Sequence, residues 1–215
     1  MNRLERLEFC SALFARDGAS EERLEFFDRC ASDWDKEVDD EEFSKLKKVI
    51  KIADIKRGER VLDVGCGTGI FLPLLKEAVG KKGEVVALDF SSNMLKKAKE
   101  KFGEQFRYIQ AEAENMPLED SSFDKVISFA SFPHFSDKEK AISEIWRVLR
   151  PGGRLLIAHP ASRKRINSIH REIGGAVRND TIPNNEKITD LFKKAGFTNV
   201  KITNSQNFYS LFATK

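Results

Sequence analysis

The sequence contains few of the residues from which metal sites and disulfide frameworks are built. Its three cysteines, Cys10, Cys30 and Cys66, match neither a zinc-ligand spacing nor a disulfide pattern. This pattern favours a reducing compartment, and we predict a cytoplasmic location. The chain has three histidines, and they do not form an H-x-x-x-H pair, so no metal site is predicted.

An excess of charge of one sign and a long apolar run are also absent. Lys and Arg number 37 against 34 Asp and Glu, which gives a formal net charge of +3. Nucleic-acid-binding proteins usually carry a clear basic excess, so no nucleic-acid partner is expected. No stretch approaches the length of a membrane span, and the charges within residues 1–14 argue against a signal peptide. With 215 residues and 40% hydrophobic content, the chain can form one domain with a core.

The sequence does contain a glycine-rich turn between an apolar run and a helix. Residues 61–69 read Val-Leu-Asp-Val-Gly-Cys-Gly-Thr-Gly. An apolar run that ends in glycines is typical of a buried parallel strand that turns tightly into a helix. The helix, predicted over residues 68–79, would point its free N–H groups at a ligand. A second apolar run, residues 84–88, ends in Asp89, where nucleoside-binding α/β folds bind ribose hydroxyls.

The spacing of the glycines separates two classes of ligand. The dinucleotide fingerprint is G-x-G-x-x-G, whereas this chain has G-x-G-x-G with Asp63 two residues before the first glycine. A carboxylate there would repel a pyrophosphate but suits a ligand that carries an ammonium group. Residues 63–69, with Asp89 downstream, resemble motif I and the acidic loop of class I S-adenosylmethionine-dependent methyltransferases. A nicotinamide-dependent oxidoreductase and a turn without a ligand stay open as alternatives.

Three further segments resemble the same family. Residues 111–118 (AEAENMPL) are similar to its "GDAEDLPF" segment, with Glu112 in place of the usual Asp, although Glu112 could also be a surface carboxylate. Residues 122–129 resemble its "FDxV" strand, and residues 146–153 match its "RVLKPGG" turn. The resemblance spans about residues 57–215 and is strongest up to residue 153. The motif set resembles the ubiquinone/menaquinone-biosynthesis branch of the family.

The order of the predicted elements agrees with the fold that this resemblance implies. Strands alternate with helices, and residues 198–204 and 207–214 are expected to form an antiparallel hairpin. We expect an α/β, Rossmann-like three-layer sandwich with a seven-stranded, mostly parallel sheet and an antiparallel last strand. Residues 57–215 would form the S-adenosylmethionine-binding methyltransferase domain. Residues 1–56 would add an N-terminal helical lid or extension to the same compact unit, with three helices, of which the first is predicted over residues 4–14.

The resemblance implies S-adenosyl-L-methionine as the methyl donor and S-adenosyl-L-homocysteine as the product. It implies that Asp63, Gly65 and Gly67 hold the methionine end, that Asp89 holds the ribose, and that Glu112 lies at the adenine. The full set of predicted cofactor-binding residues is Asp63, Gly65, Cys66, Gly67, Gly69, Asp89, Phe90, Met94, Glu112, Ala113 and Phe129. The protein would align a small-molecule acceptor for in-line attack. The alternative function is a cofactor-binding domain without turnover that acts through partners.

The three histidines are the catalytic candidates. His134 follows the predicted fourth strand, His159 ends the fifth, and His170 lies in an atypical segment, residues 161–185. All three are therefore expected near the carboxyl edge of the sheet, where ligands of open α/β sheets bind. A neutral imidazole could take a proton from the acceptor. The alternatives are a metal site and histidines that only line the cavity.

Other candidate acceptor contacts come from the same atypical segment and from the N-terminal helices. Asn167 lies three residues before His170, so both would face the same side of a helix. Arg163 and Arg171 could bind an anionic group on the acceptor. Trp34 could contact the acceptor from the lid. The alternatives are a solvated helix face, a surface cover over the sheet and a core position for Trp34. The oligomeric state stays open.

Overall fold

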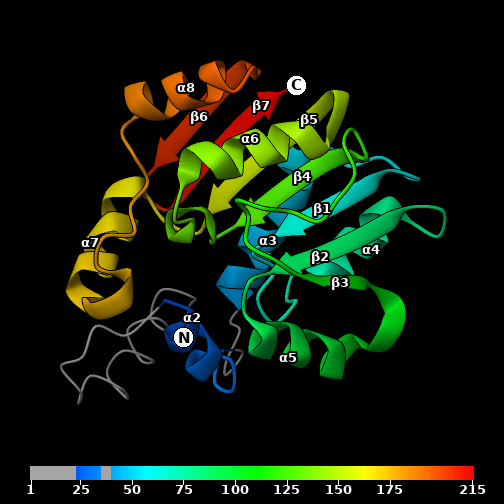
Figure 1. The fold of residues 1–215 in the computed structure, drawn as a ribbon, viewed down its shortest axis with the longest axis horizontal. Helices are drawn as coiled ribbons and strands as arrows, with labels where there is room; N and C mark the ends of the chain where they lie inside the picture. Colours follow the sequence, from blue (N-terminus) through cyan, green and yellow to red (C-terminus); the bar gives the residue numbers. More distant parts are fainter. Residues whose placement is uncertain (1–22, 35–39) are drawn as a thin grey trace.

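The computed structural model describes residues 23–34 and 40–215, so the helix predicted over residues 4–14 lies outside the described residues. Seven strands form one sheet in the order β3-β2-β1-β4-β5-β7-β6 (Figure 1). The strands are β1 Arg60–Val64, β2 Glu84–Asp89, β3 Arg107–Gln110, β4 Phe123–Phe129, β5 Leu149–His159, β6 Thr198–Ser205 and β7 Phe208–Thr214. The helices are α2 Arg23–Cys30, α3 Asp40–Ala53, α4 Leu72–Val79, α5 Ser92–Phe102, α6 Lys138–Val148, α7 Arg163–Ile173 and α8 Asn185–Lys194. Short 3-10 turns are η1 Gly103–Gln105, η2 Phe132–His134 and η3 Gly175–Val177.

The sheet has the expected topology. Strands β1 to β5 pair in parallel, and β7 runs antiparallel between β5 and β6. The β6–β7 hairpin and the antiparallel last strand are therefore confirmed. From β1 the chain adds β2 and β3 on one side and β4 and β5 on the other, so the strand order switches direction between β1 and β4. Such a switch point opens a crevice at the carboxyl ends of the strands.

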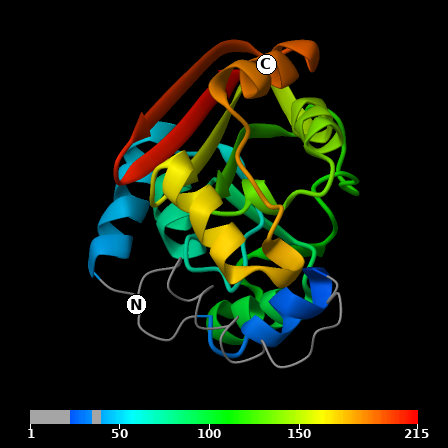
Figure 2. The same cartoon turned by 90° about the vertical axis from the view of Figure 1, so that its left-hand side faces the viewer.

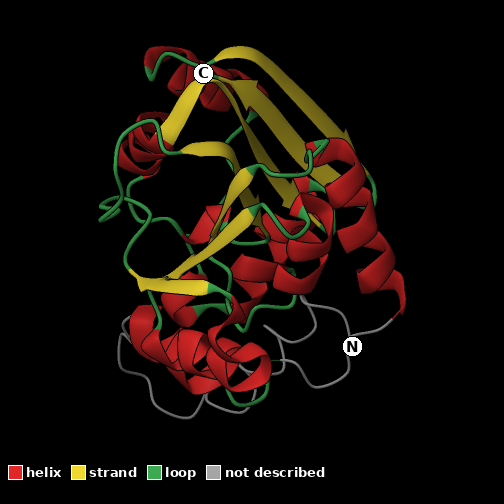
Figure 3. Cartoon of the chain, turned by 90° about the vertical axis from the view of Figure 1, so that its right-hand side faces the viewer, coloured by secondary structure: helices red, strands yellow, loops and turns green. Residues whose placement is uncertain are grey.

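Helices cover both faces of the sheet, as Figure 3 shows. Successive side chains of a strand point to opposite faces, and parallel strands buried on both faces are apolar almost throughout. On one face, strand residues such as Val61 and Val85 pack with α3, α4 and α5. On the other face, Leu62 and Val86 belong to a core completed by α6 and α8. The three-layer sandwich is therefore confirmed.

The helix after the glycine turn begins later than expected. The sequence pattern predicts helix from residue 68, but α4 begins at Leu72. Gly67 and Gly69 have φ of +55° and +82°, which a right-handed helix does not accept, so the chain stays in a turn through residue 71. Pro73 then lies in the first turn of the helix, where its missing N–H costs nothing.

The atypical segment folds as α7, η3 and an extended connection to α8. Ser162 caps α7 by accepting a hydrogen bond from the backbone N–H of Arg165. η3 meets α2, and Val177 packs in one cluster with Phe27, Trp34 and Met94. Figure 2 shows α2 (blue) and α7 (yellow) at the same end of the molecule. Among the helices of the described ranges, none combines the length and apolar character needed to cross a bilayer.

Candidate active site

The β1–α4 turn follows the end of β1 and is held against the neighbouring strands. The backbone N–H groups of Gly65 and Cys66 both donate to the carbonyl of Leu88 in β2, at 2.8 and 3.0 Å. Gly65 has φ of +74°, and a Cβ there would lie 2.3 Å from the Cβ of Ser131. Only glycine therefore fits between β1 and the segment that follows β4.

Asp89 ends β2 beside this turn and fixes part of it. Its Oδ2 accepts a hydrogen bond from the N–H of Gly67 at 2.8 Å, and its Oδ1 accepts one from the N–H of Ser91 at 3.0 Å. The side chain is nevertheless on the wall of a cavity. A carboxylate held in this way is pre-oriented, since its position does not depend on a ligand.

A cavity of about 650 Å³ lies at the carboxyl ends of the strands. Its volume is in the range of small-ligand and cofactor sites. One half of its wall comes from the strand ends and α5: Gly65, Gly67, Asp89, Phe90, Met94, Gln110, Glu112, Ala113, Ala130 and Ser131. A glycine turn that a side chain would obstruct, with Asp89 and Glu112 nearby, fits a ligand with an amino-acid end, a ribose and an amino-substituted base.

Seven of the predicted cofactor residues lie on this wall: Gly65, Gly67, Asp89, Phe90, Met94, Glu112 and Ala113. The other four, Asp63, Cys66, Gly69 and Phe129, are not on the wall that the described residues form. Phe129 packs its ring on Phe71, with centroids 5.9 Å apart. A Cβ at Gly69 would meet Leu72 and Ala98, so this glycine faces the helices. Roles for these four in binding stay predictions.

The other half of the cavity is largely aromatic and belongs to α2 and the segment after β4. The ring of Phe27 makes edge-on contacts with Trp34 and Phe90, at centroid distances of 5.8 and 5.6 Å. Further wall residues are Arg23, Leu24, Glu114, His134, Phe135 and Ser136. Trp34 thus lies on the cavity wall and in the core cluster of α2, in a turn beyond the end of that helix.

His134 is the predicted catalytic histidine that reaches the cavity. Its Nδ1 lies 2.7 Å from Oδ2 of Asp180, in the connection after η3. Arg23 binds the same carboxylate through Nη2 at 2.6 Å and Nε at 3.2 Å. Burial alone would raise the pKa of Asp180, but hydrogen bonds from His134 and Arg23 outweigh it and keep that pKa below its ordinary value. Asp180 is therefore an ionised acceptor, and the Nδ1 of His134 carries the proton.

Burial also decides the charge of the two histidines in this cluster. It lowers the pKa of His134, and the hydrogen bond to Asp180 opposes this shift without reversing it. His170 donates from Nδ1 to the backbone carbonyl of Asp180 at 2.5 Å, and its ring centroid lies 4.8 Å from that of His134. Burial and the neighbouring His134 lower the pKa of His170 to about 4. Both imidazoles are therefore neutral at pH 7.

The structure does not bring the remaining acceptor candidates to the wall that the described residues form. Asn167 uses both ends of its amide on the backbone of Ile182, so it fixes the connection after α7. Arg163 donates to Asn185 and to the carbonyl of Pro183. His159 is buried in the sheet, and its ring centroid lies 6.1 Å from that of Tyr209. None of the five residues His159, His170, Asn167, Arg163 and Arg171 is among the described wall residues, so their expected roles at the acceptor stay predictions.

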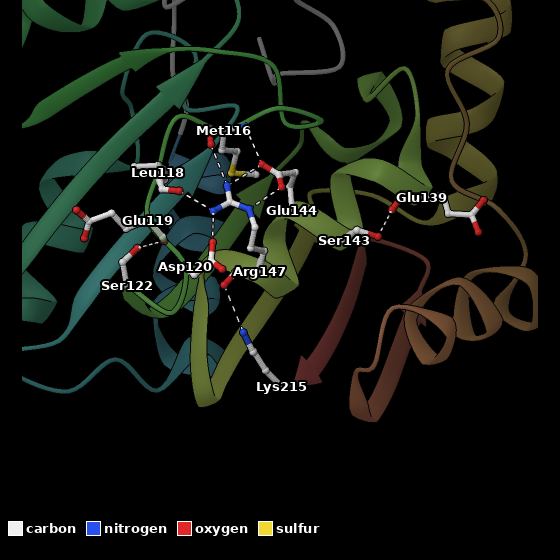
Figure 4. A network of polar contacts seen from close by, with 10 residues as sticks. All are labelled: Met116, Leu118, Glu119, Asp120, Ser122, Glu139, Ser143, Glu144, Arg147 and Lys215. Carbon is white, nitrogen blue, oxygen red and sulfur yellow. Dashed lines mark hydrogen bonds and ion pairs between the residues drawn. The ribbon is translucent and has the colours of Figure 1, made fainter.

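Two sets of contacts around the cavity could not be predicted from the sequence pattern. Along the sequence, Asp180 lies 46 residues from His134 and 157 residues from Arg23, and no local motif predicts either contact. The second set belongs to Arg147 of the "RVLRPGG" turn, which donates to the carbonyls of Met116 and Leu118 and pairs with Glu144 and Asp120 (Figure 4). Arg147 thus holds the loop that follows Glu112 and Ala113 on the cavity wall.

Comparisons with known proteins agree with this geometry. A family model described as "Methyltransferase domain" matches residues 62–157. The ubiquinone/menaquinone biosynthesis C-methyltransferase of Haemophilus ducreyi is 30% identical over 192 residues, which cover 76% of this chain and 71% of that protein. The demethylmenaquinone methyltransferase of Staphylococcus saprophyticus is 32% identical over 180 residues, 73% of this chain and 77% of that protein. A solved S-adenosylmethionine-dependent methyltransferase from Aquifex aeolicus has a TM-score of 0.65 and 26% identity, covering 79% of this chain and 88% of that one.

Proposed function

Because the chain belongs to the class I S-adenosylmethionine-dependent methyltransferases, we propose that it methylates a small-molecule acceptor held beneath α2. One observation carries the proposal: a single cavity runs from the glycine turn and Asp89 to the aromatic side chains of Phe27 and Trp34. A volume of about 650 Å³ leaves room for a cofactor and a small acceptor, but not for a folded macromolecule.

In this proposal the two halves of the cavity have separate tasks. S-adenosylmethionine supplies, when bound, a methyl group already activated by a sulfonium. Asp89 accepts hydrogen bonds from the ribose hydroxyls, and Glu112 accepts one from the adenine amino group. Asp63, Gly65 and Gly67 hold the amino-acid end. The chain's contribution to the rate is then the alignment of the acceptor, which removes much of the entropic barrier to a two-molecule reaction.

We propose a flat, largely apolar acceptor for the other half. The two relatives are named for ubiquinone, menaquinone and demethylmenaquinone, and the rings of Phe27, Trp34 and Phe135 would suit an aromatic acceptor of that kind. Described residues give less support to an anionic acceptor. The arginine on the wall, Arg23, already binds Asp180, whereas Arg163 and Arg171 are not on it.

We also propose that α2 acts as the lid within an N-terminal extension, residues 1–56, on the domain of residues 57–215. α2 is tied to α5 by a hydrogen bond between Asp28 and Ser91, and it reaches the atypical segment through Arg23 and Asp180. Its apolar face, with Phe27, forms part of the cavity wall. A lid on a few such contacts can open for the acceptor and close for the reaction.

Two measurements test the proposed function. Calorimetry should show tight binding of S-adenosylhomocysteine and none of NADH; the reverse would establish the nicotinamide alternative. Protein incubated with S-adenosylmethionine should then release S-adenosylhomocysteine when an organic-solvent extract of cells, rich in quinone-like compounds, is added. Binding without release, with this extract and with an aqueous small-molecule fraction, would identify a cofactor-binding domain without turnover.

A further inference from the structure

The contacts of His134 point to a proton-transfer role that depends on a residue outside the cavity. His134 is on the cavity wall, whereas Asp180 is not among the described wall residues and contacts the ring at Nδ1. The Asp180 carboxylate engages Nδ1, so the proton of a neutral imidazole is on Nδ1 and the lone pair is on Nε2. Within the described part of the chain, Nε2 has no hydrogen-bond partner.

We propose that Asp180 is a positioning residue that keeps the lone pair of His134 on Nε2, so that Nε2 can take the proton that the methyl acceptor loses. This inference rests on the proposed methyl transfer. The acceptor is then a group that loses a proton, such as a hydroxyl, an amine or an activated aromatic C–H. The acceptor's electron pair forms the bond to the methyl carbon, and the carbon–sulfur bond breaks with its electrons on sulfur. The proton of the acceptor passes to Nε2.

The charges around His134 suit this step. Proton transfer converts His134 to a cation while the positive charge of the sulfonium disappears, so the site's net charge does not change. Asp180, at 2.7 Å, stabilises that cation directly. The other groups that act on His134 are the cations Arg23, on α2, and Lys138, at the start of α6, together with the ring of His170. These cations disfavour a permanently charged imidazole, so His134 returns its proton to solvent after each turnover.

Arg23 makes the role of Asp180 testable by a single substitution. Arg23 has only donors, and its shorter contact is from Nη2 to Oδ1 of Asp180 at 2.6 Å. In Asp180→Asn we expect the amide oxygen at that position and the NH₂ at the position of Oδ2, toward His134, with the weaker 3.2 Å contact of Nε lost. Nδ1 must then accept, and the proton moves to Nε2. The ring stays in place, but Nε2 no longer has a lone pair for the acceptor's proton.

The first arm of the experiment requires no acceptor. The chain has three histidines, so nitrogen NMR can assign every imidazole tautomer. We expect His134 in the Nδ1–H form in the wild type and in Asp180→Glu, and in the Nε2–H form in Asp180→Asn. The matched control is Asp124→Asn, because Asp124 also accepts from an arginine, Arg150, and from a backbone N–H, but lies at the start of β4. An Nε2–H form in the wild type, or the same tautomer in wild type and Asp180→Asn, would overturn the inference.

The second arm measures release of S-adenosylhomocysteine with the organic extract, as a function of pH. Asp180→Asn and His134→Gln should each lower the maximal rate about 100-fold or more, with S-adenosylhomocysteine affinity unchanged. Asp180→Glu should turn over faster than Asp180→Asn but more slowly than the wild type. Asp124→Asn should keep the full wild-type rate. Wild-type rates in Asp180→Asn would contradict the inference. Should Asp180→Asn fail to fold, His134→Gln and Asp180→Glu decide. If the wild type itself releases no product, the proposed function fails, and the tautomer result alone decides the role of Asp180.

Discussion

At the scale of single residues, Asp89 both fixes the glycine turn and faces the cavity. Its carboxylate accepts a hydrogen bond from the N–H of Gly67 and lies on the cavity wall. Asp89→Ala should weaken S-adenosylhomocysteine binding by roughly 1–3 kcal/mol, because it removes a charged acceptor and loosens the turn. Calorimetry measures this loss, and Asp124→Ala, remote from the cavity, is the control. An unchanged Kd for Asp89→Ala would remove this residue from the site.

Gly65 allows a test of why the turn needs glycine. Gly65→Ala combines an unfavourable φ of +74° with a Cβ 2.3 Å from that of Ser131, whereas Gly58→Ala has φ of +90° and open space. The backbone cost is roughly 1–2 kcal/mol for an L residue, so Gly58→Ala should lower the free energy of unfolding by about that amount. Gly65→Ala should lower the free energy of unfolding clearly more than Gly58→Ala does. Ser131→Gly, added to Gly65→Ala, should restore part of that extra loss. Equal losses at both positions in urea unfolding would show that the contact with Ser131 does not matter.

At the scale of the elements, Arg147 links α6 to the loop between β3 and β4. It makes hydrogen bonds to two backbone carbonyls and two carboxylates, and those to Glu144 raise its pKa further above its already high value. Arg147→Ala should therefore destabilise the protein by about 2–3 kcal/mol, because it leaves partly buried acceptors unsatisfied. Hydrogen exchange in residues 115–121 should rise most.

The matched control for Arg147 is Arg150, three residues further along the chain, in β5. Arg150 pairs with Asp124 in a partly exposed position, and pairs that solvent reaches are worth about 0–1 kcal/mol. Arg150→Ala should therefore change stability little and leave exchange in the loop as it is. If the two variants behaved alike, Arg147 would be an ordinary surface residue, and the loop would be held by other contacts.

On the scale of the whole molecule, the sequence predicts best what is local. The glycine turn lies within one short motif and each strand within one apolar run, so the turn and the sheet order could be predicted. The acceptor half depends on contacts between distant segments, such as Arg23 with Asp180 and His134 with Asp180. A helical spacing correctly grouped Asn167 with His170, but it could not show that this face of α7 packs on its own connection.

The buried histidines also make the stability of the whole molecule depend on pH. In the folded protein the pKa of His170 falls from 6.5 to about 4, and that of His134 is lowered as well, so the unfolded chain binds more protons between these values. The contribution of these neutral histidines to the free energy of unfolding should therefore be fully present above pH 6.5 and be lost as the pH falls towards 4. For His170 alone this pKa difference amounts to about 3 kcal/mol. Asp180 adds its own loss only below its ordinary pKa of 3.8, since its pKa is lowered.

Urea unfolding at a series of pH values measures this dependence. His170→Gln keeps a donor for the carbonyl of Asp180 but cannot be protonated, so its stability should fall less steeply between pH 6.5 and 4.5. The slope should decrease by about 1.4 kcal/mol per pH unit, which corresponds to one proton. His134→Gln should reduce it in the same direction, because its imidazole is also buried as the neutral form. A slope equal to that of the wild type in both variants would mean that carboxylates, not these histidines, set the acid limit of the fold.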